Sequence, residues 1–168
     1  IVIICSSCTR SFVTPIEQYT VTRLQRNQIA QAFPLLQSQS GGLSLERWQD
    51  YAARLTATEN AIAKCGIIVV ESPRGYLRGL FSYFVGPHLS DGERVIIDSF
   101  IVVDTIDRPR VAMALVDAIP SLVNEMNCTK VALCLEAHDA WLLPLLYAAG
   151  FEQHGSEMTQ ILSRKMDC

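Results

Sequence analysis

The stretch FIVVDTIDRPRVAMALVDAI, residues 100–119, leads from an apolar run into a helix and decides how the fold is interpreted. Its first part is β-branched and apolar, which is typical of a buried strand. Asp107 is a good N-cap, Pro109 suits the first turn of a helix, and apolar residues then recur at helical spacing. A helix start favours negative charge, but a turn built for phosphate is usually rich in glycine, and this one has none.

The composition predicts one folded domain. The chain has 168 residues, of which 49% are hydrophobic and 18% are charged. This is enough apolar surface for a core, which disordered chains lack. We expect residues 1–18 to be a frayed or processed N-terminal extension and residues 19–168 to form the domain.

The charge and hydropathy patterns indicate that the chain binds neither nucleic acid nor a membrane. The net charge is −3, and the 14 Lys and Arg residues are scattered along the chain, so we expect no nucleic-acid partner. No apolar run approaches the roughly 18–20 residues that cross a bilayer, so we expect a soluble protein without a membrane contact. The sequence is compatible with a homodimer.

The six cysteines are scattered, which suits a reducing cytoplasm. Cys65, Cys128 and Cys134 lie in or beside apolar segments, where a free cysteine usually behaves as a small buried residue. Cys5 and Cys8 have CxxC spacing, but the second half of a zinc site is missing. We therefore expect no metal.

Periodicity predicts the order β-α-α-β-β-β-α-β-α-β. The strands are expected at 19–24, 61–72, 76–86, 94–104, 130–136 and 156–164, and the helices at 25–37, 44–55, 107–126 and 139–150. Residues 87–93 are expected to form a polar loop. A first half rich in hairpins, followed by alternating strands and helices, indicates a mixed, mostly antiparallel α/β (α+β) sheet with helices on both faces.

This order resembles that of the GNAT N-acetyltransferase superfamily. VIIDSFIVVD (95–104) is similar to the fourth strand of that family, DRPRVAMALV (107–116) occupies the place of its pyrophosphate loop and third helix, and DAWLLPLLYAAGFE (139–152) resembles its fourth helix. The resemblance implies direct acyl transfer from acetyl-CoA to a small-molecule or peptide amine.

The resemblance also implies a cofactor site where the fourth and fifth strands splay apart. The pantetheine arm would pair with the backbone of Phe100, Ile101 and Val102, and the pyrophosphate would bind at the third helix, with Asp139 in the place of a family Asn. The helix contributes the guanidinium groups of Arg108 and Arg110 and the N–H groups of Val111, Ala112 and Met113. Only Ala112 fits the family's loop pattern, because Arg110 replaces a glycine. The alternative is that Asp107 to Pro109 simply start a helix with two solvated arginines, and Asp139 could equally be an N-cap.

Two catalytic residues follow from the same resemblance. Asp98 falls where many relatives carry a base that deprotonates the acceptor ammonium, although it could equally face solvent on an alternating strand. The family's tyrosine position holds Leu146, and Tyr147 follows one residue later, about 100° around the helix. Tyr147 is the candidate acid that reprotonates the departing thiolate.

The acceptor pocket is expected between the first two helices and the 86–93 segment, where His88 either lines it or is solvated. Five aromatic residues are expected in the core because aromatic side chains on apolar faces usually pack: Trp48, Tyr51, Phe81, Tyr83 and Trp141. Two alternatives remain: a non-catalytic module of the same fold that binds a metabolite or a protein, and transfer from another acyl-CoA.

Overall fold

The structure is a computed structural model that describes residues 19–38, 41–57, 64–89, 92–103, 107–135, 137–154 and 157–162. The predictions for residues 1–18, including the Cys5 and Cys8 pair, lie outside the described residues. Within the described part, no helix combines the length and the apolar character that crossing a bilayer requires.

A seven-stranded sheet in the order β1-β2-β3-β4-β5-β7-β6 forms the centre of the fold. Its strands are β1 (Thr20–Arg23), β2 (Cys65–Glu71), β3 (Leu77–His88), β4 (Gly92–Val102), β5 (Lys130–Cys134), β6 (Glu152–His154) and β7 (Glu157–Ile161). Of the described pairs of neighbours, β4 and β5 are parallel, and the others are antiparallel. The predicted mixed, mostly antiparallel sheet is confirmed.

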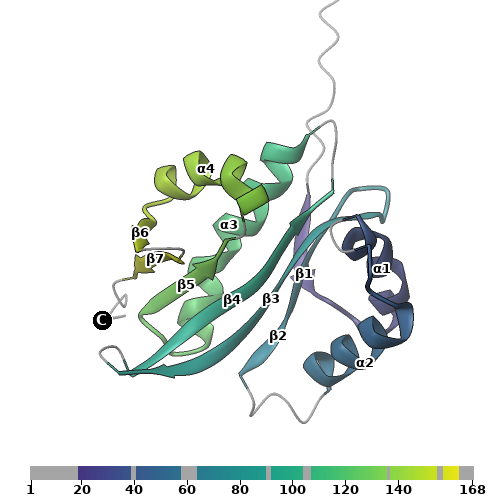
Figure 1. Cartoon of the computed structure of the whole chain (residues 1–168), viewed down its shortest axis with the longest axis horizontal. Helices are drawn as coiled ribbons and strands as arrows, with labels where there is room; N and C mark the ends of the chain where they lie inside the picture. The colour runs from purple at the N-terminus through teal and green to yellow at the C-terminus, as the bar shows by residue number, and fades with distance from the viewer. Residues whose placement is uncertain are drawn as a thin grey trace, which may run out of the picture.

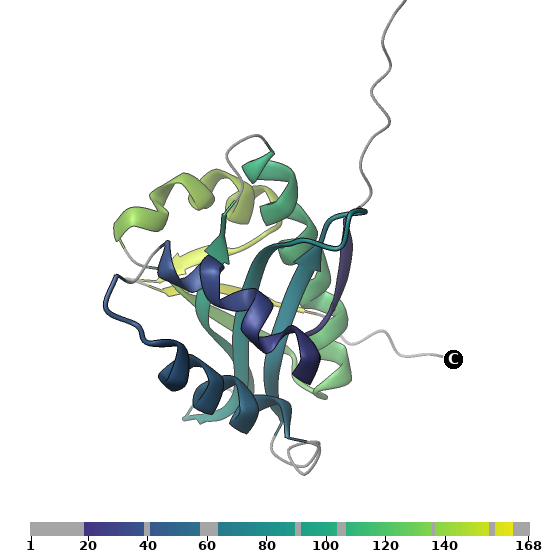
Figure 2. The same cartoon turned by 90° about the vertical axis from the view of Figure 1, so that its right-hand side faces the viewer.

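Helices cover both faces of this sheet, as predicted (Figures 1 and 2). The short 3-10 helix η1 (Arg26–Gln28) leads into α1 (Ile29–Gln37), which lies with α2 (Leu45–Thr56) on one face, and α3 (Arg108–Glu125) lies with α4 (Leu143–Ala148) on the other. Alternation along β2 supplies both cores: Ile67 and Val69 pack in the cluster of α1 and α2, and Ile68 and Val70 in that of α3. The two halves of the chain therefore share one sheet.

The C-terminal part differs from the prediction in two respects. The segment 139–150 begins as the 3-10 helix η3 (Ala137–Leu142), and only α4 is α-helical. Pro144 explains this boundary, because it has no N–H for the α-helical ladder and is well placed in a first turn. Gly150, at φ +86°, then ends the helix, as expected. The additional short strand β6 precedes β7 and pairs with it in a hairpin.

The predicted loop at 87–93 is also shorter than expected. β3 extends to His88 and β4 begins at Gly92, because the antiparallel register continues through Pro87 paired with Glu93. The long loop that was predicted to border the acceptor pocket is therefore replaced mostly by paired strand.

The start of α3 confirms the predicted helix but not the predicted cap. Asp107 precedes the helix, yet its side chain makes no capping hydrogen bond. Its carboxylate instead accepts from the Tyr19 hydroxyl at 3.4 Å and lies 3.5 Å from the Arg110 guanidinium. The first turn is closed by the Asp107 carbonyl, to which the N–H groups of Arg110 and Val111 donate at 3.0 and 3.2 Å.

The aromatic residues divide into core and surface. Trp48, Phe81 and Tyr83 are buried, as expected. Trp141 is partly buried and packs against the α3 core. The prediction for Tyr51 is wrong, because 41% of this residue is exposed. It lies three residues after Trp48 on α2, and the two rings remain neighbours, with centroids 6.2 Å apart.

Candidate functional site

The fourth and fifth strands separate in the middle of the sheet. Their parallel pairing joins Val95 to Val131 and ends where Ile97 faces Leu133. β4 continues to Val102, still paired with β3 on its other side. In Figure 1 the two strands lie together at the lower left and diverge towards α3 and α4. The predicted splay is present, and it leaves one backbone edge of Phe100, Ile101 and Val102 without a strand partner among the described residues.

A β-bulge re-aims β4 at the point where the splay begins. Ser82 of β3 faces Ser99, but the next residue, Tyr83, faces Ile97, so Asp98 is the extra residue. Ile97 and Phe100 on either side both pack in the α3 core. Asp98 and Ser99 are consequently both directed to the face that carries α1 and α2.

These two residues line a cavity of about 290 Å³ between the splayed strands and the first two helices. Its wall includes Phe100 and Ile101 from β4, Cys134 from the end of β5, and His138 and Asp139 from η3. The first two helices and the segment between them contribute Leu36, Leu43, Arg47, Trp48 and Tyr51. The predicted contribution of the two helices to an acceptor pocket therefore fits this cavity, whereas the 86–93 segment does not line it.

The negative charge of Asp98 contributes to a raised pKa at two neighbouring groups, Tyr51 and Cys134. Burial raises the pKa of Tyr51, and the Asp98 carboxylate raises it further. Burial likewise raises the pKa of the Cys134 thiol, with further contributions from Glu157 and Asp98. Both groups are therefore held in their protonated forms close to the Asp98 carboxylate.

Of the three cysteines expected to behave as small buried residues, Cys128 is buried in the α3 core and Cys65 is partly buried. The prediction for Cys134 is wrong, because this residue is exposed. It ends β5 at the splay, where β4 no longer covers it. A protonated thiol is a weak nucleophile, so this cysteine does not favour a mechanism through an acyl-cysteine.

Arg108, the first residue of α3, reaches across to η3. Its guanidinium carbon lies 3.7 Å from the centre of the Trp141 ring, which is stacking distance. Nε of Arg108 and Nε1 of Trp141 are both buried, with no hydrogen-bond partner among the described residues. Because α3 follows β4 and η3 follows β5, the Arg108–Trp141 pair lies beyond the C-terminal ends of the two separated strands.

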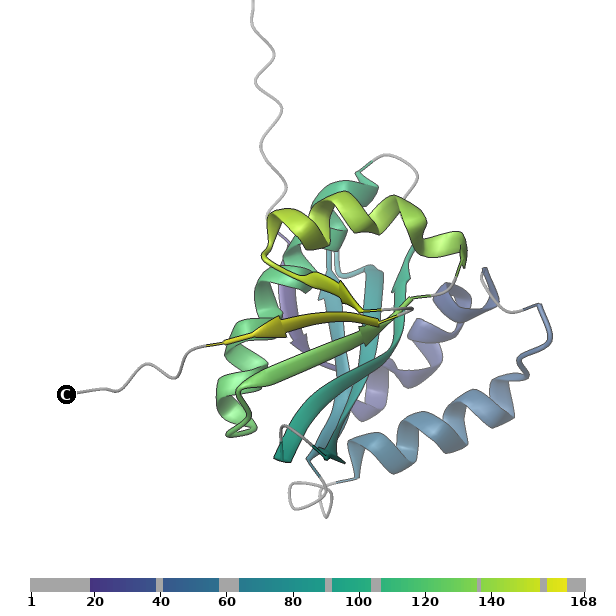
Figure 3. The same ribbon diagram turned by 60° about the vertical axis from the view of Figure 1, so that its left-hand side comes forward.

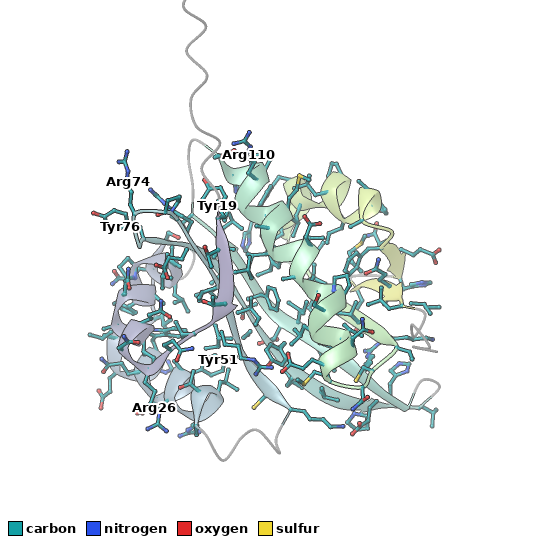
Figure 4. The ribbon with its side chains drawn as sticks, turned by 180° about the vertical axis from the view of Figure 1, so that it is seen from behind. Tyr19, Arg26, Tyr51, Arg74, Tyr76 and Arg110 are labelled. Atoms are coloured by element: carbon teal, nitrogen blue, oxygen red, sulfur yellow. The ribbon has the colours of Figure 1, made fainter. Side chains whose placement is uncertain are left out.

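Arg110 lies differently from Arg108. Its side chain is 52% exposed, and in Figure 4 it points outward at the end of the molecule that also carries Tyr19, Arg74 and Tyr76. Tyr51 lies well away from it, towards the opposite end. The bulk that replaces a glycine in this loop is therefore directed to solvent.

The expected free N–H groups of the third helix need a correction. Val111 donates its N–H to the Asp107 carbonyl, and Val111 and Ala112 are fully buried in the α3 core. Because the helix begins at Arg108, the N–H groups of Ala112 and Met113 fall within its regular ladder. The side chain of Met113 is 49% exposed. The donors nearest the helix start are thus those of Arg108 and its side chain.

Tyr147 is not brought together with Asp98. Its side chain is exposed, and its hydroxyl donates to Oε1 of Gln153 at 2.7 Å, while Leu146 is buried. Tyr147 does not belong to the cavity lining, whereas Tyr51 does. Asp139 is buried, and Oδ1 of its carboxylate lies 3.6 Å from Nε2 of His138. It begins no α-helix as a cap.

His88 lines a different hollow, of about 570 Å³, on the open face of the second half of the sheet. Figure 3 brings β5, β7 and β6 into view, with α1 and α2 at the right of the picture. Arg94 and Glu157 form an ion pair in this hollow at 3.3 Å. Within the described residues, no group of three His, Cys, Asp or Glu side chains is arranged for a metal ion.

Sequence reasoning missed the contribution of Arg47, Tyr51, Ser99 and Cys134 to the cavity. A signal for Ser99 was available: the apolar residues Val95 and Ile97 are out of phase with Phe100 and Val102, as a bulge at 98 requires. Arg47 and Tyr51 are four residues apart and share a helical face. Their direction depends on how α2 crosses the sheet, which the sequence does not encode locally.

No protein-family model and no curated protein matches the chain. Solved structures do match. An aminoglycoside N-acetyltransferase in complex with CoA aligns with a TM-score of 0.71 at 12% identity, covering 92% of this chain and 99% of that one. A spermidine N-acetyltransferase from Vibrio cholerae, in complex with CoA and spermine, gives 0.68 at 15% identity, with 89% and 99% covered. An acetyltransferase of the GNAT family from Streptococcus pneumoniae gives 0.65 at 9% identity, with 87% and 100% covered. The chain has the GNAT fold, and the resemblance found in the sequence is confirmed at the level of the fold.

Proposed function

We propose that this chain is an acetyl-CoA-dependent N-acetyltransferase that acts on an amine by direct acyl transfer. The observation that carries the proposal is the placement of Asp98: a β-bulge directs its carboxylate into a cavity that begins where β4 and β5 separate. Similar structures of this fold include N-acetyltransferases solved with CoA, which supports the choice of cosubstrate. A base in a cavity at an open strand edge is the arrangement that amine acylation needs.

The described residues fit an acyl-CoA in two respects. The free edge of Phe100 to Val102 offers backbone groups for the amides of a pantetheine arm. Arg108 has a buried Nε without a hydrogen-bond partner among the described residues, and its guanidinium carbon lies 3.7 Å from the centre of the Trp141 ring, so the remaining N–H groups can bind phosphate. Arg110 adds positive charge at the same helix start without filling it.

The chemistry assigned to the protein is limited to proton transfer and orientation. Asp98 would take one proton from the acceptor ammonium, so that the nitrogen can form the new C–N bond. The C–S bond of the thioester then breaks, and the departing sulfur takes up the second proton that the nitrogen loses. Tyr51 would stay protonated beside that carboxylate, since its pKa is raised, and would orient the acceptor by donating a hydrogen bond. Tyr147 has no part in this scheme.

Binding of acetyl-CoA is the first test. At a concentration of about 100 times the dissociation constant, a ligand that binds only the folded state stabilises it by about 2.7 kcal/mol. For a chain of this size we expect the melting temperature to rise by roughly 5–10 °C, measured by thermal unfolding with and without acetyl-CoA. The absence of any shift with millimolar acetyl-CoA or longer acyl-CoAs would favour the non-catalytic module instead.

Arg108→Ala should weaken CoA binding about tenfold, because it removes a charge-assisted hydrogen bond to phosphate. Trp141→Leu should weaken it in the same direction by a smaller factor, since the guanidinium loses its support. Calorimetric titration with CoA and with pantetheine, which has no phosphate, separates the two ends of the site. Pantetheine binding should not change in either variant, and Arg54→Ala, at the C-terminal end of α2, serves as the control. Equal losses for CoA and pantetheine would contradict the assignment.

A further inference from the structure

The cavity at Asp98 contains two opposite charges that do not pair with each other. Asp98 makes no hydrogen bond or ion pair within the described part of the chain, and the same holds for the Arg47 guanidinium. The other acidic residue of the lining, Asp139, is buried beside His138. A carboxylate and a guanidinium that line one cavity and remain unpaired are complementary to a ligand that carries both an ammonium and an acidic group.

The two charges lie at different positions along the length of α2, and both residues are exposed. Asp98 is close to Tyr51, because its carboxylate contributes to the raised pKa of that phenol. Arg47 precedes Tyr51 by four residues on α2, and side chains at this spacing lie about one turn apart on the same face. The position of Arg47 is fixed by the start of α2, where its N–H donates to the Ser44 hydroxyl at 3.3 Å. Arg47 therefore lies about one turn nearer the start of α2 than the phenol beside Asp98.

The site also continues in that direction. A second hollow, of about 360 Å³, is lined by Gly42, Leu43, Arg47 and Tyr51, and it shares the last three with the Asp98 cavity. Arg47 consequently lies where the two hollows meet. A molecule whose amine reaches Asp98 would pass its remaining part by the guanidinium.

We propose that the acceptor is a small primary amine that also carries a carboxylate or phosphate several bonds away, with Arg47 as the residue that selects the acidic group. This inference rests on the proposed function, since it names the acceptor of the same site. Transfer joins the acyl carbon to the amine nitrogen and leaves the acidic group intact at Arg47. A polyamine would bring a second positive charge to the guanidinium, so it is disfavoured.

The test compares three acceptors of one chain length: an ω-amino acid, the matching amino alcohol and the matching diamine. We expect kcat/KM for the amino acid to exceed that for the diamine by about tenfold, which is what a hydrogen bond between charged groups at a partly exposed site contributes. The difference should lie in KM, because Arg47 binds a part of the acceptor that does not react. An aminoalkyl phosphate of the same length then distinguishes the two acidic groups, and either preference over the amino alcohol supports the proposal.

Arg47→Glu should reverse the order of the amino acid and the diamine, and Arg47→Gln should remove the preference. Arg54→Glu makes the same change of charge on the same helix outside the two described linings, and it should leave the order unchanged. A preference for the diamine in the unmodified protein, or an order that Arg47→Glu does not alter, would overturn the proposal.

Calorimetric titration of the ω-amino acid, in the presence of CoA, tests the site without turnover. Binding that exceeds that of the amino alcohol and is lost in Arg47→Glu supports the acidic-group assignment even if no acetyl group is transferred, in which case the enzymatic function alone is refuted. No difference between the two ligands in binding would refute the assignment, even if both are acetylated.

Discussion

Asp98→Asn should lower kcat by roughly 10²–10⁴-fold at saturating amine, because the amide has nearly the same shape but cannot accept a proton. Binding of acetyl-CoA should be unaffected, so its thermal shift should persist in the variant. The measurement is the release of free thiol from acetyl-CoA at steady state. Because Asp98 is the extra residue of a bulge, its neighbours do not depend on the carboxylate for packing, and the variant is expected to fold.

The pH dependence sharpens this prediction. An alkylamine has a pKa of about 10.4, so near neutral pH nearly all of the acceptor is protonated and needs a base. As the pH approaches that value, the fraction of free amine rises and the deficit of Asp98→Asn should shrink. Asp117→Asn, at an exposed position of α3, is the matched control and should behave like the unmodified protein throughout. Turnover that survives in Asp98→Asn at neutral pH would remove Asp98 from the mechanism.

Much of the fold could be predicted from the sequence because strands, turns and helix starts have local sequence patterns. The stretch that ends β4 and begins α3 combines an apolar run with Asp107 and Pro109, and the structure places the helix start at Arg108. Hairpin patterning likewise predicted that β2, β3 and β4 pair in sequence order. The short strand β6 was missed because its three residues, Glu152, Gln153 and His154, are all exposed and have no alternation to detect.

The candidate site could be predicted only in part, because it depends on contacts between segments that are distant in the sequence. Asp98 could be named from a strand pattern, but its direction is set by the bulge against β3. The sequence could not tell whether the Arg110 side chain would fill the space of a phosphate at the helix start. In the structure this side chain is exposed and directed outward. The stack of Arg108 on Trp141 joins residues of two elements that only the tertiary fold brings together.

The Asp98 cavity lies against α1 and α2, and the side chain of Trp48 joins these two helices by a hydrogen bond. Trp48 of α2 is 1% exposed, and its Nε1 donates to the Ile29 carbonyl at the start of α1 at 2.6 Å. Its ring also forms part of the cavity wall. This indole therefore contributes both to the core under the two helices and to the wall of the Asp98 cavity, the proposed acceptor site.

Trp48→Ala should reduce the free energy of unfolding by about 3–5 kcal/mol, as truncations of large buried aromatic residues do, and lower the melting temperature by roughly 6–20 °C. Trp48→Phe keeps an aromatic ring but loses the hydrogen bond to the Ile29 carbonyl, so a loss of about 0.5–1.5 kcal/mol is expected from that bond. Denaturant unfolding measures both. Because α3 packs on the other face of the sheet, the thermal shift with acetyl-CoA should survive in Trp48→Phe, while KM for the amine should rise. A loss below about 1 kcal/mol in Trp48→Ala would show that the two helices are held together without this side chain.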